Sequence, residues 1–101
     1  MGIATTPSQD GRSLTIKVSG RFDFKLHTEF RRAYESLPQR PAQYIIDLGE
    51  TEYMDSSALG MLLLLRQFAG GDGSTITLAK VRPEVAKILA VASFGKLFKV
   101  A

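Results

Sequence analysis

The sequence contains no cysteine and only one histidine among its 101 residues. Without cysteine there is no disulfide scaffold, no thiolate metal site and no cysteine nucleophile. This composition agrees with a reducing compartment, and we expect a cytoplasmic protein.

Long hydrophobic runs are also missing. No continuous apolar segment is longer than Met61–Leu65, which extends back to Ala58 if Gly60 is included. Spanning a bilayer takes roughly 20 apolar residues, so this segment predicts a buried helix and no membrane insertion. Residues 1–11 lack the apolar stretch of a signal peptide. We therefore expect a soluble protein.

The sequence also lacks a dense cluster of basic residues. The chain has 13 basic and 10 acidic side chains, a net charge of +3, and its basic residues are scattered. Nucleic-acid interfaces are normally denser in positive charge, so no nucleic-acid partner is predicted. The mild positive excess favours solubility or attraction to an acidic partner.

What the sequence does contain is enough apolar material for one compact domain over residues 1–101, since 45% of the residues are hydrophobic. Leu14, Ile16 and Val18 alternate with polar residues, which predicts a strand that ends at Gly20. Asp10-Gly11 is a turn signal, so residues 3–8 are expected to pair with this strand in a hairpin.

Apolar residues three and four positions apart predict a helix after the hairpin. Pro38 and Pro41 are expected to end this helix. Tyr44–Leu48 is a short, nearly continuous apolar run, which predicts a strand covered on both faces, as in a parallel sheet. The inner face of the helix is formed by Leu26, Phe30, Ala33, Tyr34 and Leu37.

The second half of the chain alternates between helical and strand patterns. A helix from Ser56 to about Phe68 should end at Gly70-Gly71, and residues 75–78 alternate like a strand. Pro83 suits the first turn of a third helix, with Gly95 as a cap and residues 97–100 as a last strand. The inner face of that third helix is formed by Val85, Ile88, Leu89 and Ala92.

Together these patterns predict an α/β fold. A hairpin followed by alternating helices and strands indicates a mixed sheet of four to five strands, with about three helices packed on it.

Asp55, Ser56 and Ser57 stand at the start of the second helix. Asp and Ser are favoured helix N-caps because their side-chain oxygens accept hydrogen bonds from free backbone N–H groups, so capping alone is one interpretation. A hydroxyl at a helix N-terminus is also a favourable place for a phosphate. Asp55, and Asp23 across the sheet edge, would oppose its charge. Phosphorylation would then change the surface shown to a partner without unfolding the domain.

The helix behind these residues carries more apolar surface than one packing face requires, with Arg66 and Gln67 as its polar residues near the end. Either the helix is buried on several sides, or part of it forms an exposed patch for a partner. The residues predicted to contact a partner are Ala58, Met61, Leu64 and Phe68.

Residues 54–60, Met-Asp-Ser-Ser-Ala-Leu-Gly, resemble the signature of STAS domains, specifically that of the bacterial anti-sigma factor antagonists. The family pattern is close to Met-Asp-Ser-Ser/Thr-Gly-Leu-Gly. Residues 20–23, 45–48 and 94–98 match flanking segments of the family, so the resemblance covers nearly the whole chain. Two departures stand out. Ala58 replaces the usual glycine, and the sequence ends at Ala101, leaving little room for a C-terminal helix common in the family.

The resemblance implies a STAS-type fold and a role in partner switching that regulates transcription. Ser56 matches the phosphorylated serine of the family, Asp23 and Asp55 match acidic positions near it, and Ser57 is expected mainly to cap the helix. The implied partners are an anti-sigma factor that is also a serine kinase, whose binding phosphorylation weakens, and a metal-dependent serine phosphatase. ATP and metal belong to those partners, so no cofactor is implied for this chain.

Two alternatives remain open. The first is a STAS subunit that docks on the ATPase of a bacterial lipid transporter, which shares the fold. The second is an enzyme with Ser56 or Ser57 as nucleophile and His27 as base. The sequence has no Gly-x-Ser-x-Gly elbow and no phosphate-binding loop, which favours a binding protein over an enzyme.

Overall fold

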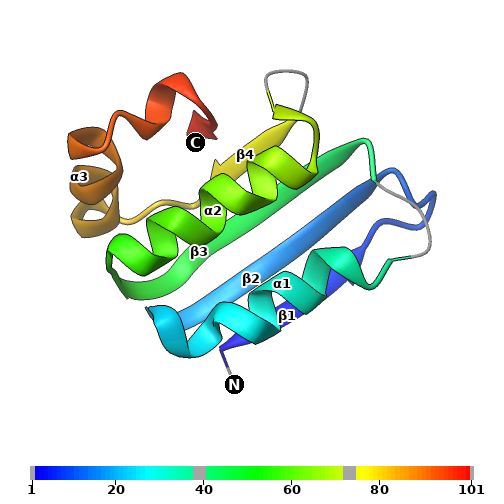
Figure 1. Cartoon of the computed structure of the whole chain (residues 1–101), viewed down its shortest axis with the longest axis horizontal. Coiled ribbons are helices and arrows are strands. Elements are labelled where there is room, and N and C mark those ends of the chain that lie inside the picture. The colour runs from blue at the N-terminus through cyan, green and yellow to red at the C-terminus, as the bar shows by residue number, and fades with distance from the viewer. Residues whose placement is uncertain (1, 38–40, 72–74, 101) are drawn as a thin grey trace.

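The computed structural model describes residues 2–37, 41–71 and 75–100, which form a five-stranded sheet in the order β1-β2-β3-β4-β5 with three α-helices (Figure 1). The mixed sheet and the helices confirm the predicted fold class. In chain order the elements are β1 (Ile3–Pro7), β2 (Ser13–Phe22), the 3-10 turn η1 (Phe24–Leu26), α1 (His27–Glu35), β3 (Gln43–Met54), α2 (Ser56–Phe68), β4 (Ile76–Ala79), α3 (Pro83–Val91), the 3-10 turn η3 (Phe94–Lys96) and β5 (Lys99–Val100).

The N-terminal hairpin forms as predicted. β1 runs antiparallel to β2, whereas β2–β3, β3–β4 and β4–β5 are parallel pairs. At the turn, the Asp10 carboxylate accepts hydrogen bonds from the Ser8 hydroxyl at 2.6 Å and from the Arg12 N–H at 3.0 Å. These bonds hold the pKa of Asp10 below its usual range.

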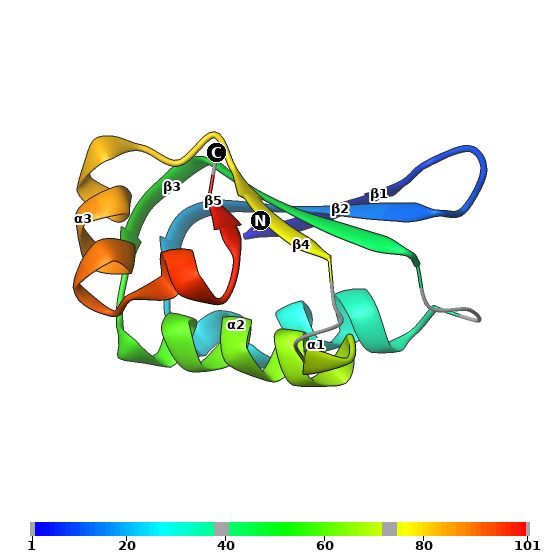
Figure 2. The ribbon, with the colours of Figure 1, turned by 90° about the horizontal axis from the view of Figure 1, so that it is seen from above.

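Helices α1 and α2 lie side by side on one face of the sheet (Figure 2). The prediction that Tyr44–Leu48 is covered on both faces is therefore wrong. Ile46 is fully buried, but Ile45 and Asp47 on the opposite face are only half-buried. Asp47 lies in the run because this face is open to solvent, where its carboxylate pairs with Lys80 at 3.6 Å.

The core lies between the sheet and the helices. A row of aromatic rings links strand β2 to the end of α2, with centroid distances of 5.2 Å, 5.8 Å and 5.1 Å between successive rings of Phe22, Phe30, Tyr34 and Phe68. The predicted inner face of the first helix is confirmed, with two residues buried and three partly buried against the core. This packing holds α1 against α2.

Strands β2 and β3 are longer than the sequence predicts. β2 continues past Gly20, whose φ of +78° suits glycine, as far as Phe22. β3 continues through the polar segment from Gly49 to Met54, which the apolar pattern did not include. Only one face of this extension is covered, because Thr51 and Met54 are buried and Glu50 and Glu52 are exposed.

The ends of the helices refine the prediction. α2 covers the predicted residues, and Gly70 and Gly71 follow it with positive φ. α1 ends at Glu35, before Pro41, and Pro38 lies outside the described residues.

The C-terminal segment follows the predicted order with shorter elements. α3 begins at Pro83, as predicted. Gly95 is not its cap, because it lies within η3, and Ser93 takes the left-handed conformation with φ of +60°. The last strand is shorter than the predicted residues 97–100.

Candidate functional site

Strands β2 and β3 end side by side, which brings Asp23 and Asp55 to the same edge of the sheet. Phe22 is paired with Met54 at the ends of the two strands. The Asp55 N–H also donates to the Phe22 carbonyl at 3.4 Å. Each aspartate follows directly after its strand. Because the two strands are parallel, their ends lie at the same edge of the sheet.

Both aspartates act as helix caps. The Asp55 carboxylate accepts a hydrogen bond from the Ala58 N–H at 3.0 Å, at the start of α2. The Asp23 carboxylate accepts one from the Lys25 N–H at 3.0 Å, at the start of η1. Two negative charges are therefore held at neighbouring helix starts, where the exposed N–H groups stabilise them.

Ser56 is the first residue of α2, and its side chain is exposed, whereas Ser57 is half-buried. The capping role expected of Ser57 belongs to Asp55. Asp55 has extended backbone angles and Ser57 lies within the helix, and a cap must stand before the first helical residue. Within the described part of the chain, the Ser56 hydroxyl has no hydrogen-bond partner. It is therefore accessible at a helix N-terminus.

Two exposed side chains near this edge were not singled out from the sequence. The Arg21 guanidinium lies 3.6 Å from the Asp23 carboxylate and 4.3 Å from the ring centroid of Tyr53. Phe24 is 67% exposed and stacks on His27 with a centroid distance of 5.4 Å. Arg21 stands two residues before Asp23, so in extended backbone both side chains lie on one side of the chain. The sequence predicts a strand only as far as Gly20, so this spacing carried no signal before the structure showed that β2 continues to Phe22.

The predicted partner surface on α2 needs correction. Ala58 and Met61 are buried in the core, with 0% and 4% exposure, so neither can contact a partner in this fold. Leu64 is 51% exposed and Phe68 is half-buried. Leu63, which was not predicted, is 41% exposed. The helix is apolar both because it covers the sheet and because it presents leucines to solvent.

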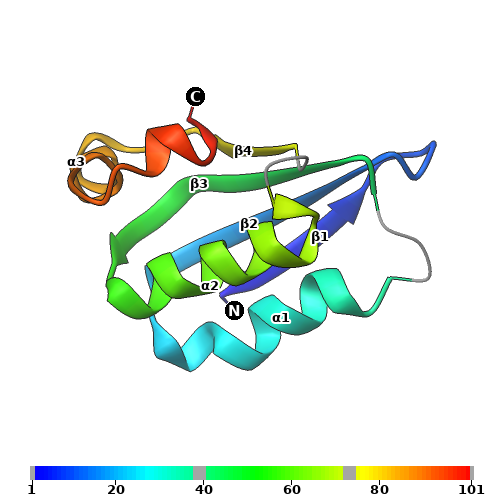
Figure 3. The same ribbon diagram turned by 45° about the horizontal axis from the view of Figure 1, so that its top comes forward.

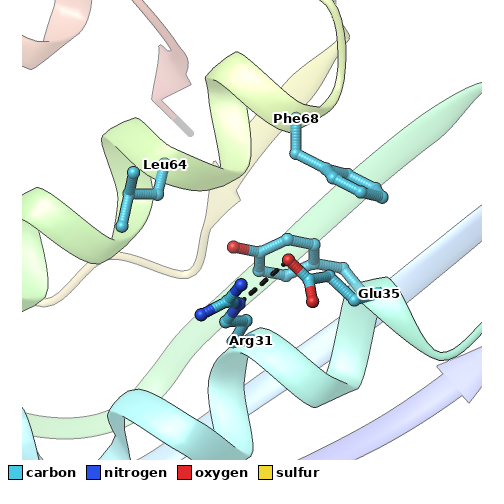
Figure 4. A pocket seen from close by; sticks show the side chains of 5 residues that line it. Arg31, Glu35, Leu64 and Phe68 are labelled. Carbon is cyan, nitrogen blue, oxygen red and sulfur yellow. Dashed lines mark hydrogen bonds and ion pairs between the residues drawn. The ribbon is translucent and has the colours of Figure 1, made fainter.

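Leu64 and Phe68 border a small cavity of about 200 Å³ between α2 and α1. Figure 4 shows them reaching toward Arg31 and Glu35 of α1, which form an ion pair at 3.0 Å. Tyr34 completes the lining, and burial raises the pKa of its hydroxyl. The charged pair makes this side of α2 more polar than the sequence indicates.

The residues of the enzyme alternative form no hydrogen-bonded pair in the described structure. His27 makes its ring contact with Phe24, and no hydrogen bond joins it to Ser56 or Ser57. In the resolved ranges no cluster of three or more His, Asp or Glu side chains is placed to hold a metal ion. Within the same ranges, no helix combines the length and hydrophobicity needed to cross a membrane.

Comparison with known proteins shows which family the chain resembles. A family model described as Mlab, STAS domain matches residues 5–99. A STAS-domain containing protein of Pseudomonas aeruginosa (strain UCBPP-PA14) is 54% identical over 100 residues, covering 99% of each chain.

Solved structures share the fold at low sequence identity. The anti-sigma factor antagonist SpoIIAA in its unphosphorylated form matches with a TM-score of 0.76 and 15% identity, over 99% of this chain and 87% of that chain. The phosphorylated form of SpoIIAA, from Bacillus, matches with a TM-score of 0.64 and 17% identity, over 97% and 91%. A sulfate transporter family protein of Wolinella succinogenes matches with a TM-score of 0.76 and 12% identity, over 93% and 80%.

Proposed function

Because the chain belongs to the STAS domain family, we propose that it is an anti-sigma factor antagonist whose binding to an anti-sigma factor is weakened by phosphorylation of Ser56. The observation that carries this proposal is the exposed Ser56 hydroxyl at the first position of α2, beside a capping aspartate. The partner is an anti-sigma factor that is also a serine kinase, and a serine phosphatase reverses the modification.

Ser56 suits phosphorylation better than Ser57 on physical grounds. A kinase must reach the hydroxyl, and Ser56 is exposed while Ser57 is half-buried. At the first helical position the new phosphate lies near backbone N–H groups that have no partner within the helix. Asp55 already occupies the Ala58 N–H, so the phosphate adds negative charge to the site without replacing the cap.

The modification changes the charge of the site more than its shape. A phosphoserine carries about two negative charges at neutral pH, added here beside the carboxylates of Asp23 and Asp55. Arg21 offsets one of the two carboxylate charges, so the net charge of the site changes from about −1 to about −3 after phosphorylation, and an acidic partner is repelled. The chain itself serves as a binding module in the cytoplasm, with no catalytic residues and no cofactor of its own.

The direct test uses purified anti-sigma factor kinases from the source genome. Incubation of each kinase with ATP and this protein should yield phosphate on Ser56, located by peptide mass spectrometry. Ser56→Ala should abolish incorporation and Ser57→Ala should retain it. Phosphate found on Ser57 alone would overturn the assignment.

A binding measurement completes the test. Ser56→Ala should bind the kinase as well as the unphosphorylated wild-type protein does, and Ser56→Asp should bind more weakly. Equal affinity of the two variants would contradict a switch based on charge.

The transporter alternative shares the fold. Co-purification from the source organism under native conditions distinguishes it from the proposed function. Tagged Ser56→Ala protein should co-purify with an anti-sigma factor. Stoichiometric co-purification of a transporter ATPase instead would replace the proposed function with the alternative.

A further inference from the structure

The cavity between α1 and α2 has a buried hydroxyl group in its wall. Tyr34 lines the cavity and is only 5% exposed. Its ring packs against Phe30 and Phe68, with centroid distances of 5.8 Å and 5.1 Å, but its hydroxyl has no hydrogen-bond partner among the described residues. Buried polar groups in proteins are normally paired. A hydroxyl left unpaired at a cavity wall therefore indicates where a bound molecule would place a polar atom.

The size and walls of the cavity indicate the body of that molecule. The cavity lies where α1 and α2 run side by side under the sheet (Figure 3), and its volume is about 200 Å³. An apolar cavity of about 150 Å³ in another protein holds one benzene ring, so this one has room for a single ring with a small substituent. Leu64 and Phe68 provide the apolar walls.

The charges at the rim indicate the substituent. Arg31 and Glu35 form an ion pair at 3.0 Å, so the rim carries one charge of each sign. A carboxylate on the ligand would be attracted by Arg31 but repelled by Glu35. Burial raises the pKa of Tyr34, which keeps its hydroxyl protonated and able to donate. A neutral carboxamide suits this rim, because its oxygen accepts a hydrogen bond and its N–H groups donate.

We propose that the cavity is a binding site for a small aromatic carboxamide, with its ring against Leu64 and Phe68, its oxygen accepting from the Tyr34 hydroxyl and its N–H groups donating to Glu35. The site goes beyond the proposed function. Leu64 lies two turns further along α2 than Ser56, a rise of about 12 Å, and binding there requires neither a kinase nor a phosphate.

The test is a titration of the isotope-labelled full-length protein, followed by NMR, with three ligands of nearly equal shape. Benzamide should bind with a dissociation constant on the order of millimolar, as expected for about nine non-hydrogen atoms. Acetophenone keeps the acceptor oxygen and lacks the donors, and benzoate adds a negative charge. Each should bind about threefold or more weakly than benzamide, because a hydrogen bond is lost or a charge is repelled.

Two pairs of variants locate the site. Tyr34→Phe keeps the ring and removes the hydroxyl, so benzamide should bind about threefold or more weakly, whereas Tyr53→Phe removes an exposed hydroxyl outside the cavity and should have no effect. Leu64→Trp should fill the cavity and abolish binding. Leu63→Trp provides the control, because Leu63 is similarly exposed and does not line the cavity. The NMR spectrum of each variant also shows whether it is folded.

Several outcomes would overturn the proposal. Absence of benzamide binding by the wild-type protein would exclude the site, and equal affinity for the three ligands would show unspecific apolar contact. Undiminished binding by Tyr34→Phe would mean that its hydroxyl is not engaged. Equal losses for Leu63→Trp and Leu64→Trp would place the ligand elsewhere. None of these results bears on phosphorylation of Ser56, which is measured with the kinase.

Discussion

At the residue scale, the cap of α2 and the exposed hydroxyl beside it belong to different residues. Asp55 has extended backbone angles and caps α2, whereas Ser56 is a helical residue whose exposed hydroxyl has no hydrogen-bond partner among the described residues. The sequence predicted the site as a group, because Asp and Ser before an apolar run are helix-start signals. It could not assign the cap to Asp55 rather than Ser57, because aspartate and serine cap helices equally well. The choice depends on the residue at which β3 ends and α2 begins.

The cap can be tested through stability. Asp55→Ala removes the acceptor for the Ala58 N–H and should lower the free energy of unfolding by about 1 kcal/mol. Asp55→Asn keeps an acceptor oxygen and should lose less than half as much. Urea denaturation of the three proteins measures the difference. Equal losses for both variants would mean that charge, and not the hydrogen bond, stabilises the helix start.

At the element scale, the structure departs from the sequence prediction most in β3. The apolar run of Tyr44–Leu48 was recognisable, but the strand extends six residues further, through Met54. These residues are polar because one side of the extension faces solvent, so their hydrophobicity carried little signal. Pairing with β2 keeps them extended, and a pairing partner cannot be read from one segment alone.

The same extension contains an irregularity that Thr51 stabilises. Residue pairing between β2 and β3 shifts after Lys17, and Val18 has no residue paired with it on β3. The hydroxyl of Thr51, which is fully buried, donates to the Val18 carbonyl at 2.7 Å. This side-chain bond therefore joins the two strands at the point where their residue pairing shifts.

Replacing this hydroxyl should be costly. Thr51→Val keeps the shape but leaves the Val18 carbonyl without its buried donor, so the free energy of unfolding should fall by about 1–3 kcal/mol. Thr51→Ser keeps the donor and should lose less. Chemical denaturation compares them, and amide hydrogen exchange of residues 18–22 should speed up in Thr51→Val alone. A neutral Thr51→Val would show that water satisfies the carbonyl.

At the scale of the whole molecule, the sequence predicts the arrangement of the layers better than it predicts which residues are exposed. Alternating patterns indicated the hairpin, the helices and the order of elements, because each reports burial along one segment. Which residues of α2 stay exposed depends on how α1 and α3 cover it. That is why Met61, an apolar residue on an apolar helix, was assigned to the surface and lies in the core.

The site at the sheet edge also predicts how the whole domain responds to phosphorylation. Phosphoserine at position 56 adds charge at a helix N-terminus, where the dipole stabilises it by about 0.3–1 kcal/mol, against repulsion from two neighbouring carboxylates. These opposing effects should leave the free energy of unfolding within about 1 kcal/mol of the unmodified protein. The switch would then act on binding and not on folding.

Ser36 provides the contrasting position. It caps the C-terminal end of α1, where its hydroxyl donates to the Arg32 carbonyl at 2.6 Å. Phosphoserine there loses this donor and meets the negative end of the helix dipole, so it should destabilise the domain by more than phosphoserine at position 56 does. Site-specific incorporation of phosphoserine, followed by urea denaturation, measures both. Greater destabilisation from position 56 would mean that repulsion from Asp23 and Asp55 exceeds the favourable dipole, so that phosphorylation acts on folding as well as on binding.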